Sequence, residues 1–369
     1  MGVMYLAFFD ASVALAALAA LAYFMYTFSQ YRTAQATQSV RRHGKGARAR
    51  AAMQPALAGM SNSPFARALH LISGYATNQS SQTLAAVQRT HAAGATATAV
   101  PLRSDFEVAD SALPVSEASA AYGRLGSILV WLLAFTLAMT MIARVAITGH
   151  APWTNMYEAS IALTEFLMLA YIYFELRYKT RTLGVGATGV GLILLLFAIW
   201  VGAAFNQAEP VAFHKIMPAL QDNPILTIHV SMMIVSYAFF IVAFICGVIM
   251  LVQGDEAKPR YAWLPSGEAA DELGYRSVTI GFPLLALGVI LGAWWANYAW
   301  GHYWSWDPKE TSALVTWLIY AVYLHARGIR GWRGNRIAWL LTLGFAATLF
   351  TYYGVSFFVP SLHSYAVPQ

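Results

Sequence analysis

The sequence predicts an all-α, polytopic membrane helix bundle with about eight transmembrane helices. Of its 369 residues, 58% are hydrophobic and 11% are charged, whereas soluble domains carry roughly 25% charged residues. Apolar runs long enough to cross a bilayer recur along the chain. Basic residues lie between these runs, as membrane topology requires. The net charge of +6 therefore indicates membrane lipid, and no nucleic acid, as a partner.

The first run is expected to be a retained span, because no small-residue cleavage site and soluble domain follow it. The chain then divides into a first transmembrane helix (1–29), a cytoplasmic linker, partly disordered (30–122), and a seven-helix domain (123–369). Seven or nine spans are the alternatives to eight. In order, the expected spans are 5–28, 125–147, 159–176, 183–205, 225–252, 278–295, 311–326 and 337–358.

The linker is rich in Ala, Ser, Thr and Gln, and we expect one short helix in it, near 65–75. Its basic run at 41–50 could lie on anionic lipid headgroups, although a topogenic anchor is the simpler interpretation. Within the spans, the single cysteine, Cys246, excludes a disulfide framework. Small residues let helices approach closely, and four glycines lie in the first half of the fourth span, at Gly184, Gly186, Gly189 and Gly191.

The charges fix the expected orientation. With the linker in the cytoplasm, 20 of the 23 Lys and Arg residues lie on that side, and only Arg144, Lys215 and Lys309 lie outside. Because cytoplasmic loops carry the excess of basic residues, both termini should be external. The loop between the sixth and seventh spans should be external too.

That loop contains an aromatic run, WWANYAWGHYWSWDPKET, at residues 294–311, with five of the chain's 12 tryptophans. Trp and Tyr favour the membrane interface, so a simple aromatic belt is the alternative interpretation. A block this dense suits a large, flat, apolar ligand better. The candidate ligand-binding residues are Trp294, Trp295, Trp300, Tyr303, Trp304, Trp306 and Asp307.

Three histidines lie at or near membrane depth, where an imidazole is costly without a partner. His229, near the start of the fifth span, and His363, after the eighth, are both expected at the outer side. His325 lies about 22 Å of helix rise beyond Thr311, near the inner side. Two imidazoles at one depth can hold a haem iron from opposite faces, although a lone interfacial His is commonly a hydrogen-bonded boundary residue. His325 needs a partner protein's ligand or is a satisfied core histidine.

The other polar residues are expected to bind ligand carboxylates, cap a helix or face solvent. The three outer cations are the candidates to meet haem propionates. Asp307 and Glu310 could act as bases, but acids at a helix N-terminus favour capping. His302 is expected to be structural, and His150 and His214 to be solvated.

The segment WGHYWSWDPKET at 300–311 resembles the WWD motif of the haem-handling proteins of cytochrome c maturation. Its DPKET ending is similar to the System II branch, the CcsA (ResC-type) subunits, rather than to CcmC or CcmF. Further matches are TNMYE at 154–158, PAL at 218–220 before His229, and VPSLHSY at 359–365. The resemblance covers roughly residues 120–369. Ser312 departs from it, because an aromatic residue commonly follows there, and the long linker is a second departure.

The resemblance implies a membrane subunit of a holocytochrome c synthase (haem lyase) in the bacterial cytoplasmic membrane, with the WWD segment and C-terminus periplasmic. It implies haem b as cargo, His229 and His363 as external axial ligands, and His325 as an inner ligand shared with a CcsB (ResB-type) subunit. The implied acceptor is apocytochrome c with a CxxCH peptide, and a thioredoxin-like protein keeps its thiols reduced. A haem exporter without ligation activity, a membrane b-type electron-transfer subunit and a purely structural subunit are the rival functions.

Overall fold

The computed structural model describes residues 2–57, 116–205, 224–254 and 260–362, with side chains from residue 4 to 36 in the first range. These residues lie in helices and short turns, which confirms the all-α prediction. The contacts divide the chain into two units, Met1–Ala34 with Asp105–Gln369, and Gln35–Ser104. The helix expected near 65–75 lies outside the described residues.

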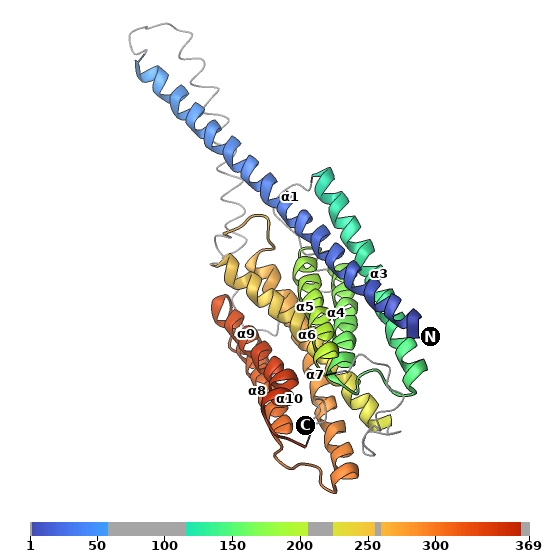
Figure 1. Cartoon of the computed structure of the whole chain (residues 1–369). Helices are drawn as coiled ribbons and strands as arrows, with labels where there is room; N and C mark the ends of the chain where they lie inside the picture. Colours follow the sequence, from blue (N-terminus) through green and yellow to red (C-terminus); the bar gives the residue numbers. More distant parts are fainter. Residues whose placement is uncertain (1, 58–115, 206–223, 255–259, 363–369) are drawn as a thin grey trace. The chain divides into compact units, whose positions relative to one another are not determined.

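A helix lies at each of the eight predicted spans (Figure 1). The last span is made of three pieces, because a π-helical turn interrupts it. The elements are α1 (Gly2–Leu57), α3 (Glu117–Thr148), α4 (Met156–Tyr178), α5 (Leu183–Ala204), α6 (Pro224–Gln253), α7 (Gly267–Trp300), α8 (Pro308–Gly328), α9 (Asn335–Leu349), η2 (Phe350–Gly354) and α10 (Val355–Phe358).

Two helices extend well beyond the predicted spans. The first helix was expected to end at residue 28, but α1 continues to Leu57. The α7 helix begins where Ser266 accepts a hydrogen bond from the backbone N–H of Ala269, eleven residues before the expected start at 278. It ends at Gly301, whose φ of 80° suits glycine. The first seven residues of the aromatic run are therefore helical, rather than part of a loop.

Seven helices of the described residues are long and apolar enough to cross a membrane, with α9 to α10 counted as one, and α8 is not among them. The reason is its polar content, since it begins with Pro-Lys-Glu-Thr and also has polar residues on its buried face, at Thr316, Tyr320, Tyr323 and Arg327. Arg327 pairs with Asp271 and Glu272. The Tyr323 hydroxyl is buried with no hydrogen-bond partner among the described residues.

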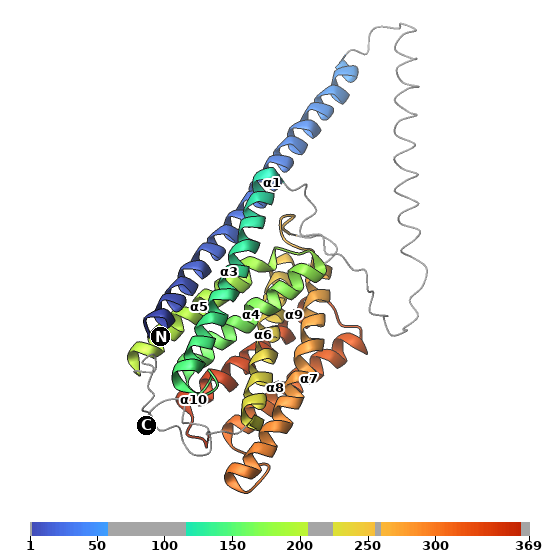
Figure 2. The ribbon, with the colours of Figure 1, turned by 90° about the vertical axis from the view of Figure 1, so that its right-hand side faces the viewer.

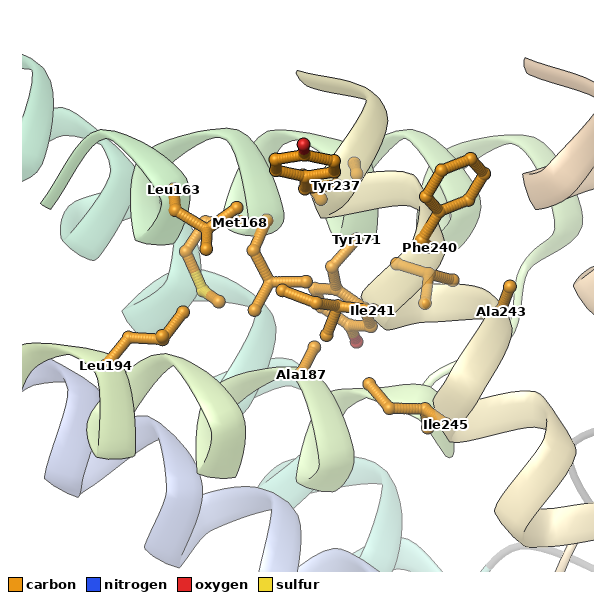
Figure 3. Packing of buried hydrophobic residues seen from close by; sticks show 14 of the residues in the cluster. Leu163, Met168, Tyr171, Ala187, Leu194, Tyr237, Phe240, Ile241, Ala243 and Ile245 are labelled. Carbon is orange, nitrogen blue, oxygen red and sulfur yellow. The ribbon is translucent and has the colours of Figure 1, made fainter. Parts of the chain in front are cut away.

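The centre of the bundle is formed by α4, α5 and α6 (Figure 3). Figure 2 shows α6 beside α7, and α8 beside α9. Glycines on α5 allow the close packing that the sequence predicted. A Cβ atom on Gly184 would lie 2.7 Å from the Tyr23 ring of α1, and one on Gly186 would lie 2.7 Å from Ile245 of α6. A Cβ atom on Gly191 would lie 3.0 Å from Met168, whereas one on Gly189 would face open space.

Candidate functional site

A cavity of about 150 Å³ is lined by residues of α4, α6, α7, α8 and η2. Whole small-molecule ligands commonly occupy about 300–1,000 Å³, so this cavity encloses part of a large ligand. Its walls are mostly apolar. They include Trp153, Thr154, Asn155, Met156, Leu226, His229, Met233, Tyr237, Gly292, Trp295, Trp304, Lys309, Glu310, Thr351 and Tyr352.

His229 lies in the wall of this cavity, between α6 and α7. A Cβ atom on Gly292 would lie 2.6 Å from the imidazole, so the glycine makes room for the ring. The Nδ1 atom is 2.6 Å from the carbonyl oxygen of Gly288. Because a carbonyl can only accept, Nδ1 carries the proton and Nε2 carries the lone pair. Histidines that bind metals commonly have this arrangement, with the second nitrogen oriented by a hydrogen bond.

The aromatic run divides into inward and outward residues. Trp295 is buried and Trp304 half-buried, and both line the cavity. Trp300 packs against Trp295, with ring centres 4.9 Å apart. The remaining candidates point away, since Trp294, Tyr303 and Trp306 are 55%, 60% and 69% exposed. The structure thus brings two of the six aromatic candidates into the cavity beside His229.

The end of the aromatic run forms the start of α8. Asp307 is the N-cap and accepts a hydrogen bond from the backbone N–H of Lys309, and Glu310 completes the capping box by accepting from the backbone N–H of Asp307. This confirms the capping role that the sequence favoured. Trp306, just before the cap, has a φ of 61°, which is uncommon for a bulky residue.

The C-terminal tail is attached to the same turn. The backbone N–H of Leu362 donates to Asp307 Oδ1 at 2.7 Å, and Lys309 Nζ donates to Ser356 Oγ at 3.0 Å. Leu362 is the last described residue of the chain. His363, the second predicted external ligand, lies outside the described residues.

The predicted cations have different surroundings. Arg144 is 4% exposed, and its Nε donates to Glu158 Oε1 at 2.7 Å. The expectation that Arg144 meets a ligand carboxylate is therefore wrong, because a buried protein carboxylate already pairs with it. Lys215 lies outside the described residues. Lys309 lines the cavity. Burial lowers the pKa of Lys309 to about 8, against the opposing effect of Asp307.

His325 is exposed on α8. The alternative of a satisfied core histidine is therefore wrong, because the side chain points out of the described bundle. His302 is also exposed, as befits a residue outside the cavity, and His150 is half-buried, with Nδ1 2.9 Å from the carbonyl oxygen of Ala151. Among the described residues, no three His, Cys, Asp or Glu side chains gather as a metal site.

Several cavity residues were not predicted as site residues. Trp153 and Asn155 come from the turn before α4, Met156 is the first residue of that helix, and Met233 lies one helical turn after His229. The signal for the turn was present, since residues 154–158 are part of the motif matches. The four-residue spacing from His229 to Met233 places both on one face of α6.

A family model described as Cytochrome C assembly protein matches residues 153–363. The Cytochrome c biogenesis protein CcsA of Porphyra purpurea is 33% identical over 285 residues, which cover 66% of this chain and 87% of that protein. The protein of the same name from Guillardia theta is 37% identical over 253 residues, covering 62% of this chain and 81% of its own. That from Prochlorococcus marinus is 36% identical over 271 residues, covering 67% and 84%.

The solved structure of Cytochrome c Heme Lyase CcmF aligns with 63% of this chain and 40% of its own length. The TM-score is 0.45, with 20% sequence identity.

Proposed function

The chain belongs to the Cytochrome C assembly protein family, as a CcsA-type protein of cytochrome c biogenesis, and from this premise we propose that it presents haem b for attachment to apocytochrome c. The haem is cargo here, and the protein is the membrane subunit of a System II holocytochrome c synthase. The observation that carries the proposal is His229, with Nδ1 on the Gly288 carbonyl, in a cavity shared with Trp295 and Trp304.

In this proposal His229 Nε2 is one axial ligand of the haem iron. The cavity is smaller than a site that encloses a whole ligand, so part of the porphyrin lies within it and the rest extends outside. Trp295 and Trp304 supply aromatic wall to the enclosed part, and Lys309 supplies a cation for a propionate. The outward Trp294, Tyr303 and Trp306 serve the part of the ligand that extends beyond the cavity.

His363 is the proposed second axial ligand. Its neighbour Leu362 is hydrogen-bonded to Asp307 through the backbone, which supports a tail held close to the aromatic turn. Asp307 then serves the haem site through the tail and the helix cap rather than as a base. Two imidazoles on opposite faces are an established way to hold haem iron.

The chemistry requires positioning more than acid or base residues. Each cysteine thiol adds across a haem vinyl group, so its sulfur bonds to one vinyl carbon and its hydrogen goes to the other. Neither partner is oxidised in this addition. The protein must bring each vinyl near its thiol and exclude water. The histidine of the incoming CxxCH peptide displaces one axial imidazole, His229 or His363, when the product leaves.

We also propose an inner haem site at His325, completed by a CcsB-type partner subunit. The exposed residues of α8 follow a three-four-three spacing at Val315, Leu318, Val322 and His325. This spacing is typical of a seam between two helices. An imidazole facing hydrocarbon alone is costly, which supports a partner helix with its own ligand. A b-type electron-transfer subunit would commonly carry both inner ligands on one chain.

The proposed location is the bacterial cytoplasmic membrane, with the aromatic turn on the periplasmic side. The support is the charge distribution, since 20 of the 23 basic residues fall on the opposite side. There the acceptor is an apocytochrome c with its CxxCH thiols kept reduced by a thioredoxin-like protein.

An absorption spectrum of the purified protein, with its partner subunit, tests the axial ligands. His229→Ala and His363→Ala should each lose the low-spin bis-imidazole spectrum and most cytochrome maturation, and added imidazole should restore the spectrum. His302→Ala is the matched control, because this exposed histidine lies in the same aromatic run outside the cavity. Normal spectra and normal maturation in both ligand variants would refute the assignment.

The rival functions differ in the product. A haem exporter would bind haem yet leave a co-expressed CxxCH acceptor without thioether-bound haem. A purely structural subunit would bind no haem at any histidine. Haem that stays with the acceptor after acid–acetone extraction, and only with His229 intact, supports the synthase proposal against both.

A further inference from the structure

A chain of buried contacts joins α1 to the wall of the cavity. The Tyr5 hydroxyl of α1 donates to the Tyr157 hydroxyl of α4. The Arg144 guanidinium carbon lies 5.4 Å from the Tyr5 ring centre and 5.6 Å from that of Tyr157. Arg144 Nε in turn donates to Glu158 Oε1 at 2.7 Å. These four side chains are 0%, 1%, 4% and 2% exposed, in the order Tyr5, Tyr157, Arg144, Glu158.

The second carboxylate oxygen of Glu158 holds the cavity wall itself. Glu158 Oε2 accepts from the backbone N–H of Thr154 at 2.9 Å and from its hydroxyl at 2.7 Å. Asn155, the N-cap of α4, accepts from the backbone N–H of Glu158 at 2.9 Å. Residues 153–156 all line the cavity that His229 also lines. One carboxylate therefore joins the buried cation to the backbone of the wall.

We propose that Tyr5, Arg144 and Glu158 are positioning residues of the haem site, and that α1 is thereby a functional part of it. Tyr5 and Arg144 lie outside the matched family region, residues 153–363. Carboxylate hydrogen bonds are strong in a buried setting and depend on the charge that the cation stabilises. Loss of the Tyr5 hydroxyl weakens the support of Arg144, and the wall at Thr154 becomes more mobile. The coupling stands by itself, but the identity of its ligand rests on the proposed function.

The competing explanation is an ion pair that stabilises the fold without affecting the wall. The double variant Arg144→Met, Glu158→Leu distinguishes a pair that only stabilises the fold from one that also positions the cavity wall. Replacing a buried ion pair with apolar residues of similar volume commonly preserves stability. It still removes the acceptor of both Thr154 hydrogen bonds. We therefore expect a nearly unchanged thermal midpoint, with backbone N–H exchange at Thr154 faster by about fivefold or more.

A milder pair of variants isolates the contribution of α1. Tyr5→Phe removes one hydroxyl from the chain of contacts. Ser12→Ala is the matched control, because Ser12 lies on the same helix and donates to Thr136 Oγ1 at 2.9 Å, remote in sequence from the wall. Tyr5→Phe should accelerate exchange at Thr154, by less than the double variant, while Ser12→Ala leaves it unchanged.

The experiment uses the full chain purified with its partner subunit, and measures amide exchange at Thr154 together with haem retained after detergent washing. Faster exchange with several-fold lower haem retention, at unchanged melting temperature, supports the inference. Unchanged exchange at Thr154 in Tyr5→Phe and in the double variant overturns it. So does faster exchange with full haem retention. If wild-type protein itself retains no haem and matures no cytochrome, the proposed function fails, while the exchange measurement still decides the coupling.

Discussion

The two ends of α8 are built in opposite ways. At the N-terminal end, the side chains that bear chemistry turn inward, toward a cavity that Trp304, Lys309 and Glu310 share with His229. At the C-terminal end, the buried side chain is Arg327, and the histidine two residues before it is exposed.

This difference indicates which site one chain can form by itself. The outer site has a histidine oriented by a carbonyl and enclosed by aromatic residues of the same chain. The inner end has a base of buried ion pairs and presents His325 outward, so the proposed inner site would take its other ligand from a second molecule. A protein that handed haem from the inner to the outer site would need this order, with a shared site first and an enclosed one last.

The largest expected effect comes from removing the base of the inner end. Arg327 Nε lies 3.0 Å from both carboxylate oxygens of Asp271, and its guanidinium carbon is 3.9 Å from the Tyr275 ring centre. Arg327→Ala leaves the buried Asp271 carboxylate with only its longer 3.6 Å contact to Arg333 Nε, and breaking a buried pair in this way costs about 3–5 kcal/mol. A fall in the thermal midpoint far beyond that of the exposed control Arg330→Ala is the expected result. Equal midpoints for the two variants would show that the ion pairs are dispensable.

His325→Ala tests whether the inner end needs a partner's ligand. We expect a normal melting temperature, because the exposed side chain makes little packing contact. Haem at the outer site should fall by about tenfold or more, as expected when a ligand or its support is lost. The measurement is haem per protein in complexes purified with the partner subunit. Normal occupancy of the outer site in His325→Ala would remove the entry role.

Gly292→Ala tests the enclosed character of the outer site. The added Cβ would lie 2.6 Å from the His229 ring, so the ring must turn and its hydrogen bond to Gly288 must break. A side-chain end can shift, so we expect a loss of about 1 kcal/mol in stability but a clear loss of the bis-imidazole spectrum. Gly189→Ala is the control, since that glycine faces open space. Identical spectra for both variants would contradict this geometry.

The sequence predicted the helices well because hydropathy and length determine them. Where the predicted helix boundaries were wrong, the causes are local. The first seven residues of the aromatic run lie on α7, and interfacial Trp and Tyr fit a helix end as readily as a loop. The Asp307 cap was predictable because capping depends on near neighbours. His229 was predicted as a ligand from its type and depth, and its place in the cavity wall depends on Gly292, which no single residue pattern links to it.

The roles of Arg144 and the aromatic side chains could not be predicted in the same way. Sequence position placed Arg144 at the outer side, where a free cation was expected, but its buried partner Glu158 comes from the next helix. Likewise, Trp294 and Trp295 are neighbours in sequence, yet one is 55% and the other 1% exposed. Successive residues of a helix point about 100° apart, and only the packing of α7 determines which one faces inward.

Asp307→Ala and Glu310→Ala form a matched pair at the start of α8. Both remove part of the capping box, at about 0.5–2 kcal/mol, but only Asp307 also binds the backbone N–H of Leu362. Asp307→Ala should therefore release the tail and lose the bis-imidazole spectrum, with recovery on addition of imidazole. Glu310→Ala should lose stability with the tail still bound to Asp307, and because Glu310 also lines the cavity, its spectrum should change, but less than that of Asp307→Ala. Asp307→Asn, which keeps an acceptor oxygen, should resemble wild type. Equal spectra in the two alanine variants would leave Asp307 as a cap only.

The smallest expected effect is the pH dependence that Lys309 gives the outer site. Its pKa of about 8 lies below the ordinary value of 10.5, so the folded chain releases this proton before the unfolded chain does. Folding stability from this group therefore rises with pH between these two values. The attraction for a haem propionate changes in the opposite direction, because the charge is lost above about pH 8.

Haem retention in wild type should thus fall by about two- to fivefold between pH 7 and 9, as expected for one partly screened ion pair. Haem retention in Lys309→Met should be low and independent of pH over that range, because methionine has no proton to lose. Haem retention in Lys309→Arg should be high and independent of pH, because the guanidinium stays charged. Soret absorbance after dialysis at each pH measures retention. Parallel curves for wild type and Lys309→Met would assign the pH dependence to another group and leave the cavity without a titrating cation.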